Sequence, residues 1–325
     1  MPDTDPVLKP TADTAKSPGV DSVTTKKEEL DYCYTLTDKL FVLSLGKNAH
    51  FSNARFLGDF SLTLEEAQAA KCEYIAKMCR MQEGSRVLDL GCGWGGMLRY
   101  FKDHFRVEET GVVFAEGQHK HCVETGLNVH YQDMRTLTPA DFGTFDAVTA
   151  CGSFDHVLSY DEFLHGKQEE VYRRWFDMVA DLLPIGGRYY MQTMTFGRKI
   201  IPRETWDINA PTDSDEFTMA MMVKMFPLSW LPYMDEDIIK YASGRFKLIE
   251  HGSGRLDYIE TMTRWAKELR KFGWKKYGFY LSMVPKYLFD EEFRYVASIM
   301  RYHPNGRTFQ RELFDHFRFV FERIA

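Results

Sequence analysis

The sequence lacks long apolar runs, closely spaced cysteine pairs and an excess of basic residues. None of its apolar stretches is long enough and free enough of charge to span a bilayer, and its first residues show no apolar core of a secretory signal. The six cysteines show no C-x-x-C spacing, which argues against a metal centre and against a secreted disulfide scaffold. A formal net charge of −6 argues against nucleic acid or an anionic membrane as the main partner. We therefore expect a cytoplasmic protein with reduced, mostly buried thiols and no metal.

Composition separates a tail from one large domain. Residues 1–28 are rich in Pro, Thr, Asp, Ser and Lys and predict a disordered tail. Residues 29–325 can bury one large core, because 44% of the chain is hydrophobic. Residues 196–244 are charged, aromatic and Met-rich, and they interrupt a pattern that resumes after them. We interpret this segment as a substrate cap over the carboxyl edge of a sheet, where ligands bind in such folds.

Strand-like and helix-like segments alternate through the rest of the domain. Apolar or alternating runs predict strands at 87–90, 108–114, 127–133, 145–153, 186–195, 245–254 and 312–324. Helical spacing marks 30–45, 61–81, 96–105, 115–125, 167–183 and 258–301. The helix at 61–81 begins with a capping box formed by Thr63 and Glu66. This order predicts an α/β fold with a doubly wound, mostly parallel seven-stranded sheet and a helical cap insertion.

The segment VLDLGCGWGG, residues 87–96, says most about function. Its glycines follow a buried strand directly, so the backbone turns sharply and approaches a ligand with no Cβ in the way. The spacing is not the pyrophosphate fingerprint G-x-G-x-x-G, and the next strand ends in apolar residues 112–114 where that fingerprint would have an acid. Asp89 and the turn behind it therefore suit the ammonium and carboxylate of an amino acid better than a diphosphate.

Five segments together carry a resemblance to a known family. They are SLTLEEAQAAK (61–71), GSRVLDLGCGWGG (84–96), TGVVFAEGQ (110–118), FDHV (154–157) and DYIETMTRW (257–265). From about residue 49 to 325 the chain resembles the cyclopropane fatty acid and mycolic acid cyclopropane synthase family of S-adenosylmethionine-dependent methyltransferases. The resemblance implies a class I methyltransferase domain with a Rossmann-like sheet and S-adenosyl-L-methionine as cofactor.

The resemblance also implies which residues hold the methionine part of the cofactor. Gly91 and Gly93 would pack against it, and Phe51 and Ser52 from the loop before the first strand would close over it. Residues 46–58 have the mixed polar and aromatic character of such a loop.

The nucleoside contacts implied by the resemblance come from later strands. Gln118 matches the family's ribose-contacting glutamine, which explains why no acidic residue ends the second strand. Asp133 and Met134 stand where methyltransferases bind the adenine, the acid accepting from its exocyclic amine and the Met lying on the ring. Cys151 and Gly152 end the next strand beneath the sulfonium.

The chain departs from the family at the residues that would handle the substrate. The cyclopropane synthases hold a bicarbonate, thought to serve as base, with a cysteine, a glutamate, a histidine and a tyrosine. Here the cysteine position is Asn53, the glutamate is shortened to Asp155 and the histidine is Gln192; Tyr258 is kept. Ring closure to a cyclopropane becomes doubtful, and simple methyl transfer is favoured.

Methylation of an alkene carbon leaves a carbocation, which needs aromatic faces around it and a base that removes a proton. Asp155 or His156 is the candidate base, with Tyr258 as a partner that relays or orients the proton; His50 and Glu260 rank lower. The cap supplies six aromatic side chains for the cation: Phe196, Trp206, Phe217, Phe226, Trp230 and Tyr233.

Four basic residues, Arg188, Arg198, Lys199 and Arg203, are expected to cluster where a strand ends and the cap begins. Arg198 and Lys199 are the candidates for gripping a diphosphate or carboxylate on the substrate. Such a grip suggests an alternative to a fatty acyl chain, namely an isoprenoid diphosphate, whose alkene would be methylated by the same cation chemistry.

The sequence thus predicts a C-methyltransferase acting on an alkene of a hydrophobic small molecule, either an isoprenoid diphosphate or an unsaturated acyl chain. Two alternatives stay open. One is an N-methyltransferase of a small amine, because plant alkaloid N-methyltransferases share the scaffold and motifs. The other is a cofactor-binding protein without methyl transfer, serving as a regulator or a cyclase. The aromatic surface of the cap is also a candidate interface for a homo-oligomer.

Overall fold

The computed structural model describes residues 42–45, 50–226, 229–291, 293–294 and 303–325. The tail predicted at 1–28 lies outside these residues, and so does most of the helix predicted at 30–45, of which residues 42–45 are described and helical. No described helix combines the length and the apolar character needed to cross a bilayer.

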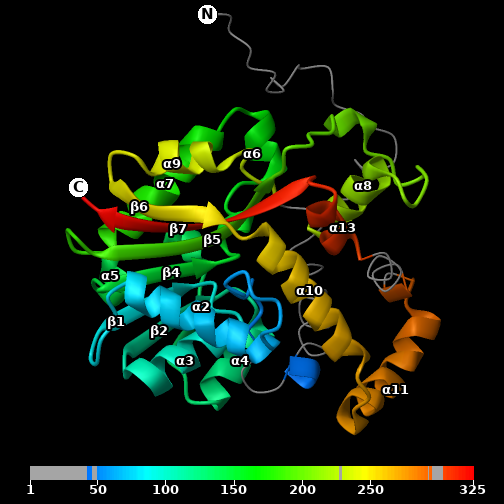
Figure 1. Ribbon diagram of the computed structural model, residues 1–325, viewed down its shortest axis with the longest axis horizontal. Coiled ribbons are helices and arrows are strands. Elements are labelled where there is room, and N and C mark those ends of the chain that lie inside the picture. The colour runs from blue at the N-terminus through cyan, green and yellow to red at the C-terminus, as the bar shows by residue number, and fades with distance from the viewer. Residues whose placement is uncertain (1–41, 46–49, 227–228, 292, 295–302) are drawn as a thin grey trace, which may run out of the picture.

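Seven strands form one sheet in the order β3-β2-β1-β4-β5-β7-β6 (Figure 1). They are β1 (Arg86–Leu90), β2 (Glu108–Val113), β3 (Val129–Tyr131), β4 (Ala147–Cys151), β5 (Arg188–Phe196), β6 (Phe246–Ser253) and β7 (Phe314–Arg323). Strands β1 to β5 pair in parallel, whereas β7 runs antiparallel to both β5 and β6. The predicted doubly wound, mostly parallel seven-stranded sheet is confirmed.

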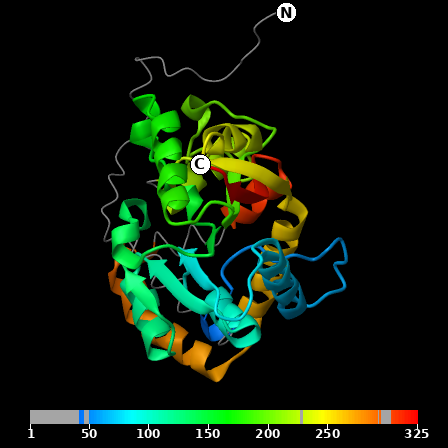
Figure 2. The ribbon, with the colours of Figure 1, turned by 90° about the vertical axis from the view of Figure 1, so that its left-hand side faces the viewer.

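Helices cover both faces of the sheet (Figure 1). One face carries α2 (Leu64–Met78), α3 (Gly96–Phe105) and α4 (Glu116–Glu124), and the other carries α6 (Tyr160–Leu164), α7 (Gln168–Asp181) and α9 (Asp235–Ala242). The remaining helices are α5 (Pro139–Phe142), α8 (Asp215–Met225), α10 (Arg255–Arg270), α11 (Trp274–Phe289) and α13 (Pro304–Gln310). Figure 2, turned by 90°, shows the sheet edge-on between the two helical layers, with α11 in orange at the margin of the molecule.

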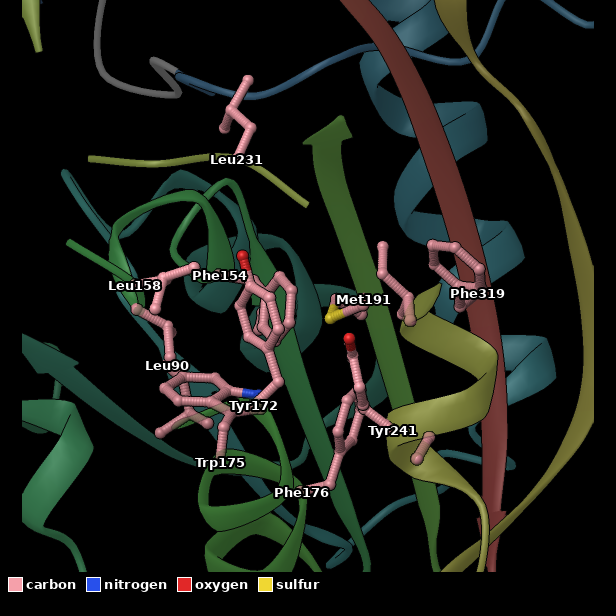
Figure 3. Packing of buried hydrophobic residues seen from close by; sticks show 14 of the residues in the cluster. Leu90, Phe154, Leu158, Tyr172, Trp175, Phe176, Met191, Leu231, Tyr241 and Phe319 are labelled. Carbon is pink, nitrogen blue, oxygen red and sulfur yellow. The ribbon is translucent and has the colours of Figure 1, made fainter. Parts of the chain in front are cut away.

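Alternation of side chains along the strands divides the core in two. Val87 of β1 and Tyr190 of β5 pack with residues of α2 and α3. Leu90 and Met191, which face the other way, belong to a larger cluster with α7 and α9, and Figure 3 shows both beside the rings of that cluster. These two apolar layers hold the carboxyl ends of β1, β4 and β5 in fixed relative positions.

The capping box predicted at the start of α2 is confirmed. Thr63 Oγ1 accepts a hydrogen bond from the backbone N–H of Glu66 at 3.2 Å, and the Glu66 carboxylate accepts one from the backbone N–H of Thr63 at 2.8 Å. Lys71 lies about two turns after the first residue of this helix, and its side chain is buried.

Residues 196–244 hold a short 3₁₀ turn, η3 (Arg203–Thr205), together with α8 and α9. Helix α9 packs against α7 and the edge strand β6. Four aromatic side chains of the segment line a small hollow near the end of β5: Phe196, Trp206, Trp230 and Tyr233. The role of this segment as a substrate cap stays a prediction.

Candidate active site

The glycine turn follows β1, whose neighbours β2 and β4 mark the reversal of strand order. Gly91 and Gly93 have φ angles of 77° and 54°, in the left-handed region. A Cβ on Gly91 would lie 2.6 Å from Cβ of Ser153, whereas a Cβ on Gly93 would have no atom within 4 Å. The turn is therefore packed on one side and open on the other, at the place where doubly wound sheets bind ligands.

Two buried donors near the turn lack a hydrogen-bond partner among the described residues. They are Oγ of Ser153, which lies against Gly91, and Nε1 of Trp94, within the turn itself. A buried polar group left unpaired costs about 1–3 kcal/mol, a cost that a polar ligand removes. The amino acid, ribose and adenine of S-adenosylmethionine offer acceptors for such donors, so the residues present fit the expected cofactor.

Asp89 lies at the centre of a buried polar group beneath the turn. Its carboxylate accepts a hydrogen bond from Thr149 Oγ1 at 2.7 Å, and burial raises its pKa to about 7 against the opposing effects of Thr149 and Lys71. The Nζ of Lys71, also fully buried, donates to Ser52 Oγ at 2.7 Å. Lys71 thus fixes the loop that carries Ser52 and lies in the electrostatic field of Asp89. The sequence reasoning did not single out Lys71.

The other predicted residues around the sulfonium end lie on β4 and on the loop before α2. Cys151 ends β4, and burial raises the pKa of its thiol well above the usual range. Phe51 stacks on Trp265 of α10, with ring centroids 5.3 Å apart and planes 7° from parallel. This contact ties the loop to α10, so Phe51 reaches the site edge from a fixed position.

The predicted nucleoside contacts lie past the ends of β2 and β3. Gln118 lies in the first turn of α4, and Met134 opens the 3₁₀ helix η1 (Met134–Thr136) while packing on the larger core. Asp133 caps η1, and its carboxylate is held by Arg135, with Nη2 and Oδ2 2.7 Å apart. An adenine amine would share this carboxylate with Arg135. The contacts of Gln118, Asp133 and Met134 with the nucleoside stay predictions.

Asp155, the candidate base, lies on the 3₁₀ helix η2 (Phe154–His156) after β4 and is 3% exposed. Its Oδ1 accepts hydrogen bonds from Thr193 Oγ1 at 2.5 Å and from the backbone N–H of Met194 at 2.8 Å, while burial raises its pKa to about 6. His156 instead pairs through Nδ1 with Ser229 Oγ at 2.6 Å, and burial lowers its pKa to about 4. Of the two candidates, Asp155 has the pKa suited to a base near neutral pH.

The four positions that the resemblance assigns to the family's anion site are connected in pairs, Asn53 with Gln192 and Asp155 with Tyr258. The Asn53 amide donates to the backbone carbonyl of Gly254 at 2.9 Å, and Gln192 Nε2 donates to the backbone carbonyl of Asn53 at 3.2 Å. The Asn53 amide also lies 3.1 Å from Nδ1 of His316, whose ring centroid is 5.0 Å from that of Tyr258. Burial, and after it the negative charge of Asp155, raises the pKa of the Tyr258 phenol above its usual range. The group therefore extends from Gln192 to Tyr258 with an imidazole at its centre.

His316 is the residue of this group that the sequence reasoning missed. It lies on β7 opposite Met194 of β5, and residues that are paired across two strands point to the same face of a sheet. Gln192 is two residues from Met194 on β5, so its side chain and that of His316 are on one face. The neighbouring antiparallel strand thus brings an imidazole near position 192, where the resemblance implies a histidine and this chain has a glutamine. The alternating pattern of the final strand indicated that residues 316 and 318 share one face. It did not indicate which strand would lie beside them or in which register.

The two lower-ranked candidates differ in their surroundings. His50 is buried, and its pKa is lowered well below the usual range by burial and by the charge of Lys71. Glu260 pairs with Arg264 one turn along α10, with Oε1 and Nε 2.5 Å apart. His50 therefore borders the buried polar group around Lys71, whereas Glu260 belongs to an ion pair within its own helix.

The expectation that four basic residues cluster was wrong for Arg188. Arg188 begins β5 and pairs with Glu322 at 2.9 Å, whereas the other three follow the far end of the same nine-residue strand. A strand rises about 3.3 Å per residue, so β5 separates the two ends by roughly 25 Å. The prediction failed because it placed Arg188 at the carboxyl end of β5, whereas Arg188 is the first residue of that strand.

The remaining basic residues also make contacts that the sequence did not indicate. Lys199 forms an ion pair with Asp215 of α8, and the guanidinium carbon of Arg203 lies 4.8 Å from the centroid of the Trp206 ring. Arg198 is exposed. An anionic substrate would have to compete with Asp215 for Lys199, so the substrate-binding roles of Arg198 and Lys199 stay proposals to be tested.

Comparison with known proteins identifies relatives over about three quarters of the chain. The family described as "Mycolic acid cyclopropane synthetase" matches residues 21–277. Cyclopropane mycolic acid synthase 3 of Mycobacterium tuberculosis is 27% identical over 237 residues, which cover 73% of this chain and 79% of that protein. The S-adenosylmethionine-dependent methyltransferase UmaA of the same organism is 27% identical over 252 residues, covering 74% and 82%.

Solved structures agree on the fold. The cyclopropane synthase MmaA2 from Mycobacterium tuberculosis superposes with a TM-score of 0.69 at 20% identity, covering 92% of this chain and 99% of that one. Mycolic acid cyclopropane synthase CmaA1, complexed with SAH and CTAB, gives 0.68 at 21% identity and covers 93% and 100%. At these identities the likeness establishes the class I methyltransferase fold.

Proposed function

The chain belongs to the mycolic acid cyclopropane synthetase family of S-adenosylmethionine-dependent methyltransferases, and we propose that it methylates an alkene carbon of a hydrophobic, lipid-like molecule, with loss of a proton from the product cation. The observation that carries the proposal is the position of Asp155. A buried carboxyl with a pKa near 6 follows the end of β4 and lies close enough to Tyr258 to act on the pKa of its phenol.

S-adenosylmethionine supplies an electrophilic methyl group when it is bound along the glycine turn. Gly91 and Gly93 would give it room at the turn, Asp89 with Lys71 would provide charge for its amino acid end, and the loop that carries Ser52 would close over it. The task left to the protein is to align the acceptor carbon and exclude water, which contributes several kcal/mol, up to about 10, toward lowering the barrier.

Asp155 would accept the proton that leaves the methylated substrate. With a pKa of about 6 it is mostly ionised at pH 7 yet basic enough to take a proton, as general-base catalysis requires. Thr193 and the backbone of Met194 both bond to Oδ1, so they fix the carboxylate and leave Oδ2 without either of these bonds. Tyr258, uncharged at this pH, orients the substrate or relays the proton.

Aromatic side chains would stabilise the cation before the proton leaves. Phe196, Trp206 and Trp230 pack on one another around a hollow of only about 10 Å³, with the rings of Phe196 and Trp230 5.0 Å apart and those of Trp206 and Trp230 5.9 Å apart, so these rings would have to separate to admit a substrate carbon. A desolvated cation gains about 1–2 kcal/mol from each aromatic face that it meets. An alkene acceptor depends on such faces because its cation has no hydrogen-bond donor, whereas a methylated amine can be held by aromatic faces or by a carboxylate.

Of the two substrate classes, we favour an unsaturated acyl chain. The basic residues near the cap do not form a free cluster, because Lys199 pairs with Asp215 and Arg188 lies at the other end of β5. Cyclopropane mycolic acid synthase 3, one of the relatives described above, is named for a mycolic acid, which supports an acyl chain here as well. An isoprenoid diphosphate is the second candidate, and a strong effect of Arg198→Ala with Lys199→Ala on the KM of an anionic substrate would favour it.

The deciding experiment incubates the protein with labelled S-adenosylmethionine and a panel of unsaturated phospholipids, prenyl diphosphates and aromatic amines. Methyl transfer with proton loss and cyclopropanation both add one CH₂, so mass alone does not separate them, and the olefinic protons must be counted by NMR. Retained unsaturation supports the proposal. A lost double bond shows cyclopropanation, a methylated amine shows N-methylation, and binding of S-adenosylhomocysteine with no product from any class would indicate a regulator or cyclase.

A further inference from the structure

A cavity of about 270 Å³ lies at the end of the sheet opposite to the glycine turn. It is lined by residues of the turn between α2 and β1 and by residues at or just before the amino ends of the parallel strands β4 and β5. Strand β1 has five residues, so at about 3.3 Å per residue roughly 17 Å separates the cavity from the glycine turn. A single water needs only about 10–15 Å³ of such space, so this cavity has room for a small molecule.

Arg188 is the buried charge of this cavity. It lines the cavity, is 8% exposed and makes one ion pair, with Nη2 and Oε2 of Glu322 2.9 Å apart. Its Nε and Nη1 have no hydrogen-bond partner in the part of the chain that the structure describes. A guanidinium carries five N–H donors, and buried donors left unpaired are costly. This position therefore calls for acceptors beyond those that the described residues supply.

Arg80 brings a second guanidinium to the rim of the cavity. Its Nη2 lies 3.2 Å from the same Oε2 of Glu322 that pairs with Arg188, so one carboxylate is shared by two cations. Arg80 follows the last residues of α2 with a φ of 55°, in the left-handed region where helices usually end with glycine. A charged side chain thus stands here despite the backbone strain that it brings.

The acids that line the cavity do not pair with Arg188. Oδ2 of Asp146 accepts a hydrogen bond from the backbone N–H of Arg86 at 2.8 Å, and Glu83 lies 3.4 Å from Arg106. Both acids are exposed, so water reaches their remaining oxygens. The buried polar atoms without a partner among the lining residues are both donors, those of Arg188. A ligand that complements them must carry oxygen acceptors and negative charge.

We propose that this cavity binds a small oxyanion, a phosphate or a carboxylate, between the guanidinium groups of Arg188 and Arg80. Hydrogen bonds between a guanidinium and an oxyanion are charge-assisted and stronger than neutral ones, and the planar fork of arginine suits both ions. An ion held there joins the turn after α2 to the amino end of β5, and it stabilises the folded protein increasingly as its concentration rises. The site is separate from methyl transfer, because cavity and glycine turn lie at opposite ends of the strands.

The test titrates the full chain with inorganic phosphate and, separately, with malonate, at constant ionic strength in a chloride buffer. Calorimetry should show saturable binding of one ion per chain, and the Tm should rise by about 2–3 °C at an ion concentration ten times the dissociation constant. Tighter binding of phosphate supports the site with a phosphorylated ligand, and tighter binding of malonate supports it with a carboxylate. Saturable binding of neither ion would mean that water alone fills the cavity, and would overturn the proposal.

Three arginine-to-glutamine variants locate the site. Arg188→Gln and Arg80→Gln should each weaken binding of the preferred ion about tenfold or more, because each removes a guanidinium and its charge. Arg174→Gln is the matched control, since Arg174 is 64% exposed on α7, on the other face of the sheet, and pairs with Glu170. It should bind the ion as the unmodified protein does.

Circular dichroism and S-adenosylhomocysteine binding establish that each variant is folded. The side chain of Arg80 is 63% exposed, so Arg80→Gln tests the site even where Arg188→Gln lowers the stability of the protein. Unchanged ion affinity in either variant would place the ion elsewhere and overturn the proposal. Failure of the methyl-transfer assay would leave the titrations unaffected, because they contain neither S-adenosylmethionine nor a methyl acceptor.

Discussion

The side-chain amide of Asn53 lies 3.1 Å from Nδ1 of His316, joining the loop before α2 to the strand β7. The same amide nitrogen donates to the carbonyl of Gly254, so its orientation is fixed and Nδ1 of His316 is the acceptor. The proton of the neutral imidazole therefore resides on Nε2. Burial and Arg318 lower the pKa of His316 well below its usual range, so the ring stays neutral at physiological pH and offers an N–H donor.

His316→Ala should lower kcat by about 10²-fold, because a buried donor beside Tyr258 is lost. Since His316 is neutral across the working range, the pH dependence of the residual activity should keep its shape. His251→Ala is the control, because His251 is exposed on β6 and pairs with Asp235. Steady-state rates at saturating S-adenosylmethionine measure the effect, and an unchanged kcat in His316→Ala would remove His316 from the site.

Asp155→Asn should abolish the rise of kcat with pH near 6 and lower kcat by about 10²- to 10⁴-fold, because a neutral amide accepts no proton. An amide oxygen still accepts the bonds from Thr193 and Met194, so the fold is kept. A pH–rate profile measures this rise. If kcat of Asp155→Asn still rises near pH 6, the rise belongs to another group.

The same substitution should stabilise the protein. The folded pKa of Asp155, about 6, lies above its ordinary value of 3.8, so the folded state binds the proton more tightly than the unfolded state. The free energy of unfolding then falls as pH rises from about 4 to 6, and the charge costs on the order of 1–3 kcal/mol at pH 7. We expect a higher Tm for Asp155→Asn than for the unmodified protein at pH 7, with the difference vanishing near pH 4. A lower Tm at both pH values would contradict this.

Gly93→Ala should weaken binding of S-adenosylhomocysteine about tenfold or more, because its Cβ would enter the open side of the turn. Gly84→Ala is the control: Gly84 also has a positive φ, 80°, and no atom near its Cβ position, but it precedes β1. Both should lose about 1–2 kcal/mol of stability through backbone strain, and calorimetry should show a loss of affinity in Gly93→Ala alone. Equal affinities would mean that the cofactor lies elsewhere.

Lys71→Met should also weaken binding of S-adenosylhomocysteine, by about tenfold, without unfolding the protein. Removing the buried ammonium raises the pKa of Asp89 further and frees Ser52 from its anchor. Lys77→Met, at an exposed position on the same helix, should bind normally. Titration calorimetry at pH 7 compares them, and equal affinities would limit Lys71 to a structural role.

The fold could be predicted well because local patterns decide it. The apolar runs at 87–90 and 186–195 have the length and continuity of buried parallel strands, and both are strands of the sheet. The capping box at Thr63 acts within one turn, so it too could be recognised. The cap could not be predicted in the same way, because aromatic and charged residues there do not indicate which partners they pack against.

The candidate site was predictable where one motif holds it together. The glycines and Asp155 stand within short segments whose geometry is local. His316 depends on the register between β5 and β7, more than a hundred residues apart, which no periodicity encodes. Arg188 was misplaced for the related reason that strand direction decides which end of β5 meets the ligand.

Strand β7 is made after the other six and yet lies between β5 and β6. During translation, one edge of β5 has no partner strand until β7 is synthesised. The imidazole of His316 is likewise absent from the site until residue 316 leaves the ribosome. A nascent chain that stalls between residues 253 and 314 therefore exposes a nine-residue strand edge, which other chains can pair with. Because β7 is synthesised last and lies between β5 and β6, truncated or stalled chains are expected to aggregate as well as to lack activity.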